Sequence, residues 1–344
     1  MVDAICKEIT TRSTYLSTTV NTVYFGGGTP SLLSKDQIEQ ILDSVSKNFD
    51  IVDTPEISFE ANPEDLEQEY CEALAALGIN RLSIGFQTFD NEKLGWMNRA
   101  HDASQAQKSL ENARNAGFDN ISIDLIYALP GTPKTHWIAD LATAISLNPE
   151  HISLYGLTIE DRTVFGKRKQ KGELVELPEE TAAKQYLDAI RTLQEAGFNH
   201  YEVSNFAKSG FHSRHNSGYW DGQHYLGIGP GAHSFDGISR RLNVANNAKY
   251  IKAVSNNYSY FEVEDLSKIQ RLNEQILTGL RRAEGIDFHG MKKKFDIDLR
   301  LHYAKKLEVF EQQGMVNLDE ERLNLTPKGF LVADDIALQL FFDE

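Results

Sequence analysis

Short apolar runs typical of β-strands alternate with amphipathic helical segments between residues 22 and 197. This alternation is the pattern of parallel βα units, so it restricts the fold to the α/β class. Three of the helical segments end in the same way, with Gly78, Gly117 and Gly197 in the left-handed capping position before the next strand. The predicted strands cover residues 22–26, 56–61, 81–87, 120–127 and 151–157.

The predicted strands have two unlike faces. One face carries large apolar side chains such as Phe59, Ile84 and Ile123, which predicts that it packs under the helices. The other face carries small or polar side chains at Ser58, Glu60, Ser83, Gly85, Gln87, Ser122, Asp124, Ser153 and Tyr155. Because a closed barrel normally fills its interior with branched aliphatic side chains, we expect a barrel-like sheet that is open to hold a cofactor.

Polar groups gather where the predicted strands end. Residues 26–29, Gly-Gly-Gly-Thr, follow the first strand, and bare glycine amides let an amine, carboxylate or phosphate approach the backbone closely. Glu60, Gln87 and Asp124 end the following strands, the edge at which barrel enzymes build their sites. Arg99 supplies a cation nearby in the sequence. The competing interpretations are helix caps or ion pairs for the carboxylates and a surface position for Arg99.

Composition excludes several classes of protein. The net charge of -15 disfavours binding to nucleic acid, so residues 292–294, three lysines, are interpreted as a solvated helix face. No apolar run reaches membrane-spanning length and the N-terminus lacks a signal-peptide pattern. These features predict a cytoplasmic protein that meets a membrane only through a partner.

A second candidate site covers residues 213–220, Ser-Arg-His-Asn-Ser-Gly-Tyr-Trp. Its histidine, His215, has aromatic neighbours, a mixture that suits haem because a neutral imidazole can ligate iron and flat rings can stack on a porphyrin. Arg214, Arg240 and Arg241 are candidate partners for haem propionates. The competing interpretation is a hydrogen-bonded histidine in an aromatic core.

Three domains are predicted along the chain. They are a partial β/α barrel at 1–205, a connecting region with the haem motif at 206–265, and a helical, winged-helix-like domain at 266–344. Residues 226–233 imitate a dinucleotide-binding glycine loop, but the proline at position 230 favours a structural loop. DNA binding is the alternative role for the third domain, and the acidic balance weakens it.

Four segments carry a family resemblance: 24–31 (YFGGGTPS), 60–64 (EANPE), 80–87 (NRLSIGFQ) and 124–131 (DLIYALPG). Together with residues 151–160 and 201–207, they make the chain resemble the HemW haem chaperones. These are radical S-adenosylmethionine relatives of oxygen-independent coproporphyrinogen III dehydrogenase.

The resemblance implies two sets of site residues. Those implied to hold S-adenosylmethionine are Gly27, Gly28 and Thr29 at its methionine amino end, with Glu60, Gln87, Arg99 and Asp124 at its amino-acid and ribose groups. Those implied to bind haem are His215 as iron ligand, Asn216, Tyr219 and Trp220, which form the His-Asn-x-x-Tyr-Trp motif of the chaperone branch. The implied partners are haem-accepting proteins.

One family motif is missing from this sequence. The family carries a Cys-x3-Cys-x2-Cys loop after its first strand, whose three thiolates hold a [4Fe-4S] cluster, whereas this sequence has two cysteines, Cys6 and Cys71. The resemblance therefore predicts a partial (β/α)6 TIM-like barrel that lacks its first βα unit. A chain with this sequence is not expected to cleave S-adenosylmethionine. The strand at 22–26 would then be a sheet edge, which predicts pairing of two copies through that edge.

These expectations lead to a first hypothesis, a haem-binding chaperone that holds haem for transfer to haem proteins. The alternative is an oxygen-independent coproporphyrinogen III dehydrogenase of porphyrin biosynthesis. In that reaction a 5'-deoxyadenosyl radical would abstract hydrogen from propionate side chains. A third hypothesis is a metal-free barrel enzyme that uses Glu60 and Asp124 as acid and base.

Overall fold

The computed structural model describes residues 1–343, which form two compact units. The first unit contains Met1–Tyr24, Leu33–Ile57 and the chain from Ser213 onward, and the second contains Phe25–Leu32 and Ser58–His212. The domain boundaries expected from the sequence stay predictions.

Seven strands form one sheet in the order β1-β2-β3-β4-β5-β7-β6. Their bounds are β1 Val20–Phe25, β2 Ile51–Ala61, β3 Arg81–Gln87, β4 Ile121–Tyr127, β5 His151–Gly156, β6 Asn199–Glu202 and β7 Asn205–Ala207. The pairs β2–β3, β3–β4 and β4–β5 are parallel, as the alternation of strands and helices predicts. The α/β class is therefore confirmed.

The sheet ends in an antiparallel hairpin, which the sequence pattern did not predict. β7 pairs antiparallel with both β5 and β6. Only Val203 and Ser204 separate β6 from β7. Because a parallel pair needs a crossover of roughly a dozen residues or more, so short a link allows only antiparallel pairing.

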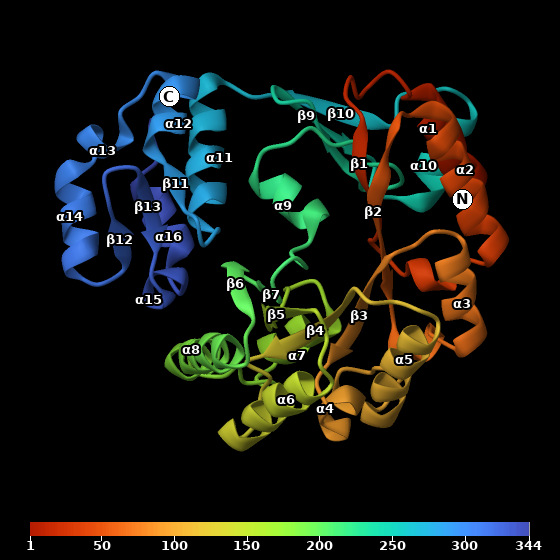
Figure 1. Ribbon diagram of the computed structural model, residues 1–344, viewed down its shortest axis with the longest axis horizontal. Coiled ribbons are helices and arrows are strands. Elements are labelled where there is room, and N and C mark those ends of the chain that lie inside the picture. The colour runs from red at the N-terminus through yellow and green to blue at the C-terminus, as the bar shows by residue number, and fades with distance from the viewer. Residues whose placement is uncertain (344) are drawn as a thin grey trace. The chain divides into compact units, whose positions relative to one another are not determined.

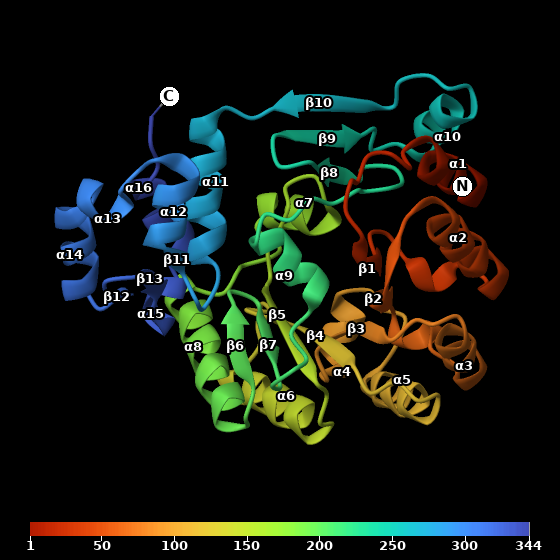
Figure 2. The same ribbon diagram turned by 45° about the horizontal axis from the view of Figure 1, so that its top comes forward.

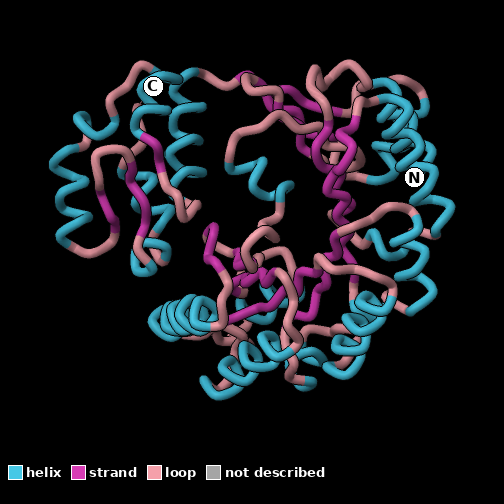
Figure 3. The backbone as a smooth tube through the Cα atoms, viewed as in Figure 1, coloured by secondary structure: helices cyan, strands magenta, loops and turns pink. Residues whose placement is uncertain are grey.

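The strands of the second unit are covered by helices on one side, which Figure 3 shows as cyan tubes outside the magenta strands. The helical segments of this unit are η1 Pro30–Leu32, η2 Pro63–Asp65, α3 Gln68–Ala76, α4 Asn91–Trp96, α5 Ala103–Asn115, α6 Lys134–Ser146, α7 Val164–Gln170 and α8 Glu179–Glu195 (Figure 1). Phe59, Ile84 and Ile123 have no exposed surface, which confirms the predicted apolar face. The glycines that end α3, α5 and α8 have φ angles of 85°, 95° and 89°, as predicted.

The first unit contains helices, strand β1, the first half of β2 and a second sheet of order β10-β9-β8. Its elements before the C-terminal part are α1 Val2–Thr11, α2 Lys35–Asn48, α9 Arg214–Trp220, β8 His233–Phe235, β9 Ser239–Asn243, α10 Asn247–Ser255 and β10 Phe261–Asp265. Helix α2 begins with a capping box, in which Ser34 Oγ accepts from the Gln37 amide and Gln37 Oε1 accepts from the Ser34 amide.

The C-terminal part combines helices with a small antiparallel sheet of order β11-β13-β12, the blue segment of Figure 2. Its elements are α11 Lys268–Leu280, β11 Ile286–Asp287, α12 Phe288–Phe295, α13 Leu299–His302, α14 Ala304–Gln312, β12 Val316–Leu318, β13 Arg322–Leu325, α15 Pro327–Phe330 and α16 Ala333–Gln339. This order of elements confirms the winged-helix-like domain. The lysines at 292–294 are exposed on α12, as predicted.

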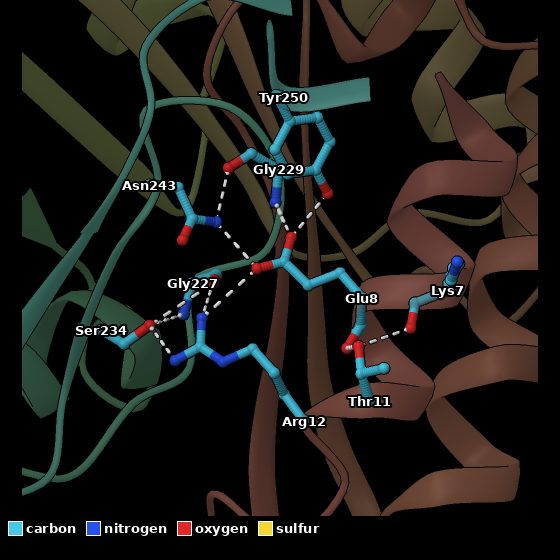
Figure 4. A network of polar contacts seen from close by, with 9 residues as sticks. All are labelled: Lys7, Glu8, Thr11, Arg12, Gly227, Gly229, Ser234, Asn243 and Tyr250. Atoms are coloured by element: carbon cyan, nitrogen blue, oxygen red, sulfur yellow. Dashed lines mark hydrogen bonds and ion pairs between the residues drawn. The ribbon is translucent and has the colours of Figure 1, made fainter. Parts of the chain in front are cut away.

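A buried ion pair joins α1 to the glycine loop before β8 (Figure 4). The fully buried Glu8 carboxylate accepts hydrogen bonds from Arg12 Nη1 (3.3 Å), the Gly229 amide (2.8 Å), Asn243 Nδ2 (2.8 Å) and the Tyr250 hydroxyl (2.6 Å). Because the loop amide binds a carboxylate of the protein itself, the glycine loop has a structural role, in agreement with its sequence-based interpretation.

Within residues 1–343, no helix combines the length and the apolar character that crossing a bilayer requires.

Candidate binding sites in the two units

A hollow of about 130 Å³ opens near the carboxyl ends of β2 and β3 in the second unit. Its lining consists of Gly28, Thr29, Pro30, Ser31, Glu60, Ala61, Asn62, Ser83, Gly85, Gln87 and Asp124. Residues from the glycine loop and from three strands therefore meet in one place. Five residues implied by the sequence are among them, namely Gly28, Thr29, Glu60, Gln87 and Asp124.

The glycine loop leaves its backbone open to a ligand. Gly27 and Gly28 have φ angles of 74° and 79°, in the left-handed region that favours glycine. A Cβ atom placed on either residue would have no neighbour within 4 Å, so this stretch is not packed against other parts of the protein. Gly27 does not line the hollow, but its amide donates to Glu60 Oε2 at 3.2 Å and so links the loop to the end of β2.

Gln87 reaches the hollow through an irregular end of β3. Its φ angle of 69° is unusual for a residue with a side chain, and the β3–β4 register shifts between Ile84 and Gln87. A Cβ atom on Gly85 would lie 2.7 Å from Gln87 Nε2. Glycine at position 85 therefore makes room for the Gln87 amide.

Asp124 lines the hollow from strand β4. Burial raises the pKa of its carboxyl group to about 6, and the negative charge of Glu60 adds to the effect. Hydrogen bonds from Ser153 and Ser83 act in the opposite direction, with Ser83 Oγ 3.2 Å from Asp124 Oδ1. Two carboxyl groups beside open backbone amides suit a ligand that carries both donors and acceptors, such as an amino acid or a sugar.

Arg99 is placed differently from the other implied residues. It is half-buried and does not line the hollow. Within residues 1–343 its guanidinium makes no ion pair. Its role at a ligand stays a prediction.

His215 lies in the first unit, in the first turn of α9, and both of its ring nitrogens have hydroxyl partners. Nδ1 is 2.9 Å from Thr22 Oγ1 on β1, and Nε2 is 3.0 Å from the Tyr219 hydroxyl. The ring also stacks on Tyr24, with centroids 4.6 Å apart and planes at 16°. Burial lowers the pKa of His215 to about 4, with an opposing effect of Glu56, so the imidazole is neutral at pH 7.

A buried carboxylate fixes the start of α9. Glu56, 5% exposed, accepts from the backbone amides of Arg214 at 3.0 Å and His215 at 2.9 Å. Ser213 caps the same turn by accepting from the Asn216 amide at 3.2 Å. The position of the imidazole is thus set by β1, β2 and the helix cap together.

The aromatic residues of the haem motif, Tyr219 and Trp220, lie toward the other end of α9. Tyr219 is 43% exposed. Trp220 has a buried Nε1 with no hydrogen-bond partner within residues 1–343, and Arg281 Cζ lies 5.9 Å from its ring centroid. An aromatic surface with an unsatisfied indole N–H is unusual for a purely structural core.

The three arginines considered for propionates have different partners. Arg214 donates to the carbonyls of Thr54 and Asn21, and Arg240 pairs with Glu274 at 2.9 Å. Arg241 instead lies over the Tyr15 ring, 4.8 Å from its centroid. Their roles toward propionates stay predictions.

Comparison with known proteins places this chain in a family. The model of the radical SAM superfamily matches residues 8–144, and that of the HemN C-terminal domain matches residues 266–332. A protein of Lactococcus lactis named heme chaperone HemW is 37% identical over 94% of this chain and 86% of its own length. Its namesake in Bacillus subtilis is 34% identical over 92% of this chain and 84% of its own length.

The chain belongs to the HemW family of radical SAM proteins. The fold agrees with this assignment, because coproporphyrinogen III oxidase (HemN) from Escherichia coli superimposes with a TM-score of 0.84 over 98% of this chain and 82% of that one. That structure is 24% identical in sequence, so the likeness concerns the fold.

The two cysteines of this HemW family member do not fit an iron–sulfur cluster. Cys6 lies in α1, and its Sγ contacts the carbonyl of Gln40 at 3.7 Å. Cys71 is fully buried in α3. Burial raises the pKa of Cys6 and raises the pKa of Cys71 to about 11, so both are protonated thiols at pH 7. A cluster needs several thiolates in one place, and no group of three or more metal-binding side chains occurs within residues 1–343.

Several residues of the two sites were not anticipated from the sequence. Ser31 and Asn62 line the hollow, Thr22 contacts the imidazole, and Glu56 accepts from the backbone amide of His215. Ser31 lies two positions after the glycine loop and Asn62 directly follows the end of β2, so the strand-end pattern could have included them. Thr22 and Glu56 are almost 200 and 160 positions from His215, and no local pattern indicates such contacts.

Proposed function

We propose that this chain is a haem-binding chaperone that holds haem through His215 and hands it to haem-accepting proteins in the cytoplasm. The observation that carries the proposal is the neutral, firmly held imidazole beside the exposed Tyr219 ring. A neutral imidazole is the form that ligates iron. The names of the relatives at 37% and 34% identity support the same function.

Each residue of the haem motif would have a definite part. His215 would offer one ring nitrogen to iron, while Thr22 and Glu56 keep the ring in place. The Tyr219 and Trp220 rings would contact the porphyrin, and Asn216 would stay within the first turn of the helix. Haem, when bound, would supply an iron centre with which the imidazole nitrogen can form a bond.

We also propose that the hollow of the second unit binds S-adenosylmethionine. The Gly27–Thr29 loop would meet its amino end, and Glu60, Gln87 and Asp124 would bind amino-acid and ribose groups. Protonated and scattered thiols do not hold a cluster, so the chain as written would bind this ligand without cleaving it.

Titration with haemin, followed at the Soret band, tests the haem-binding function. The unmodified chain is expected to saturate at one haem per chain. His215→Ala should weaken binding at least about tenfold, since an iron ligand is lost. The matched control is His224→Ala, which removes an exposed histidine of the same region and should bind like the unmodified chain. Equal binding by all three chains would refute His215 as the ligand.

Calorimetry with S-adenosylmethionine tests the hollow separately. Glu60→Gln should lower the affinity, because it removes a charge at the predicted amino end. Glu72→Gln, an exposed change on α3, should leave the affinity unaltered. The assignment of the hollow fails if both variants bind like the unmodified chain.

A further inference from the structure

The two hydroxyl partners of His215 differ in chemistry and in origin. Thr22 approaches Nδ1 at 2.9 Å from β1, and Tyr219 approaches Nε2 at 3.0 Å from within α9. A neutral imidazole has one N–H and one bare electron pair, so one hydroxyl must accept and the other must donate. Which nitrogen carries the proton decides which nitrogen can ligate a metal.

The chemistry of the partners indicates the tautomer. A phenol hydroxyl is a stronger hydrogen-bond donor and a weaker acceptor than an aliphatic hydroxyl, because its oxygen electrons are shared with the ring. The more favourable arrangement therefore has the Tyr219 hydroxyl donating to Nε2 and the Nδ1–H group donating to Thr22 Oγ1. In this arrangement the electron pair lies on Nε2, on the side of Tyr219.

The packing around the ring also indicates that Nε2 is the nitrogen that a ligand can reach. Tyr24 stacks flat on the imidazole at 4.6 Å, whereas Tyr219 meets it edge-on, with planes at 84°. Tyr219 is also 43% exposed, so it lies at the surface while the Thr22 side is formed by strand β1. A ligand from solvent would therefore reach Nε2 past the Tyr219 hydroxyl.

We propose that Thr22 presets His215 as an Nε2 ligand and that the Tyr219 hydroxyl is an internal competitor, which occupies the ligand electron pair until an iron porphyrin displaces it. This inference rests on the proposed haem-binding function. When iron binds, the Fe–Nε2 bond forms and the Tyr219 O–H···Nε2 hydrogen bond breaks, with no proton or electron transferred. The tyrosine then regulates how tightly and how fast the site takes up haem.

Variants of the two hydroxyl residues should shift haemin affinity in opposite directions. Tyr219→Phe keeps the ring but removes the competing hydrogen bond, and is expected to tighten binding about fivefold, the ratio that one ordinary hydrogen bond corresponds to. The matched control is Tyr225→Phe, which removes a hydroxyl from the neighbouring ring 4.7 Å away and should change nothing. Thr22→Val is expected to weaken binding about tenfold, and Thr22→Ser should restore it.

A measurement without haem tests the tautomer directly. Long-range ¹H–¹⁵N correlation spectra of the ligand-free chain, assigned with His215→Ala, should show Nδ1 protonated and Nε2 bare. In Thr22→Val this preference should weaken. A proton on Nε2 in the unmodified chain would overturn the proposal, and so would looser or unchanged haemin binding by Tyr219→Phe.

Haemin binding by the variants distinguishes a failure of this inference from a failure of the proposed haem-binding function. If haem binding does not depend on His215, then the unmodified chain and His215→Ala bind equally, and the function itself is refuted. If binding depends on His215 but Tyr219→Phe does not tighten it, the haem site stands and the role of Tyr219 as a competitor is refuted.

Discussion

At the scale of single residues, the hollow of the second unit places the Asp124 carboxyl group in an environment that favours its neutral form. Burial and the Glu60 charge raise its pKa, and hydroxyl donors from neighbouring strands only partly offset this. Its position could be predicted from the sequence, because polar residues at the ends of parallel strands meet at one edge of a sheet. Its partners could not all be predicted, because the facing of Ser83 and Asp124 depends on strand register.

The raised pKa of Asp124 predicts a pH-dependent effect of Asp124→Asn on the free energy of unfolding. With a pKa of about 6 in the folded state and about 3.9 when unfolded, the folded protein binds more protons between these values. The stability contribution of this group therefore falls as pH rises from about 4 to about 6. At pH 4 the free energies of unfolding of Asp124→Asn and of the unmodified chain should be nearly equal. At pH 7 the free energy of unfolding of Asp124→Asn should be higher by up to about 2 kcal/mol.

Urea unfolding at the two pH values measures this difference. The expected gain is an upper bound, because the carboxyl group is partly exposed to the hollow. A difference between the two chains that does not change with pH would contradict the assigned environment of Asp124.

At the scale of secondary-structure elements, contacts between near neighbours in the sequence could be predicted, and contacts between distant segments could not. The α2 capping box and the helix-ending glycines could be predicted because their contacts lie within a few residues of one another. The β6–β7 hairpin was missed because β7 is only three residues long, too short for a period-two pattern to stand out. The start of α9 was missed in detail because its cap includes Glu56 from a distant strand.

The capping box predicts that Ser34→Ala lowers the free energy of unfolding by a measurable amount. The serine side chain accepts from the Gln37 amide, which otherwise has no partner at the helix end. Its loss should destabilise the protein by about 1 kcal/mol in thermal or urea unfolding. The control is Ser46→Ala, which changes an exposed serine in the last turn of the same helix and should lower the free energy of unfolding much less. Equal effects of the two changes would mean that the cap does not contribute.

At the scale of the whole molecule, contacts between distant segments hold the first unit together. The Glu8–Arg12 pair joins α1 to a loop more than 200 positions away (Figure 4). The sequence indicated that this loop is structural, but no pattern in it points to Glu8. The association expected through the edge strand β1 also stays a prediction. Light scattering that shows a monodisperse monomer at high concentration would count against it.

Loss of the Glu8 charge should destabilise the protein strongly. Glu8→Gln leaves the buried Arg12 guanidinium without its counter-ion, and breaking a buried pair from one side typically costs about 3 kcal/mol or more. Lys7→Gln changes a charge on the same helix that makes one exposed hydrogen bond, and should alter stability by less than about 0.5 kcal/mol. Similar unfolding midpoints for both variants would contradict the importance of the network.

Rescue of the variant His215→Gly by free imidazole measures most directly whether His215 ligates haem iron. This variant is expected to lose the Soret spectrum of the haem complex and to regain it when imidazole enters the space left by the side chain. The spectrum of the unmodified complex should not change at the same imidazole concentration. A wild-type spectrum and affinity in His215→Gly without imidazole would show that another group ligates the iron.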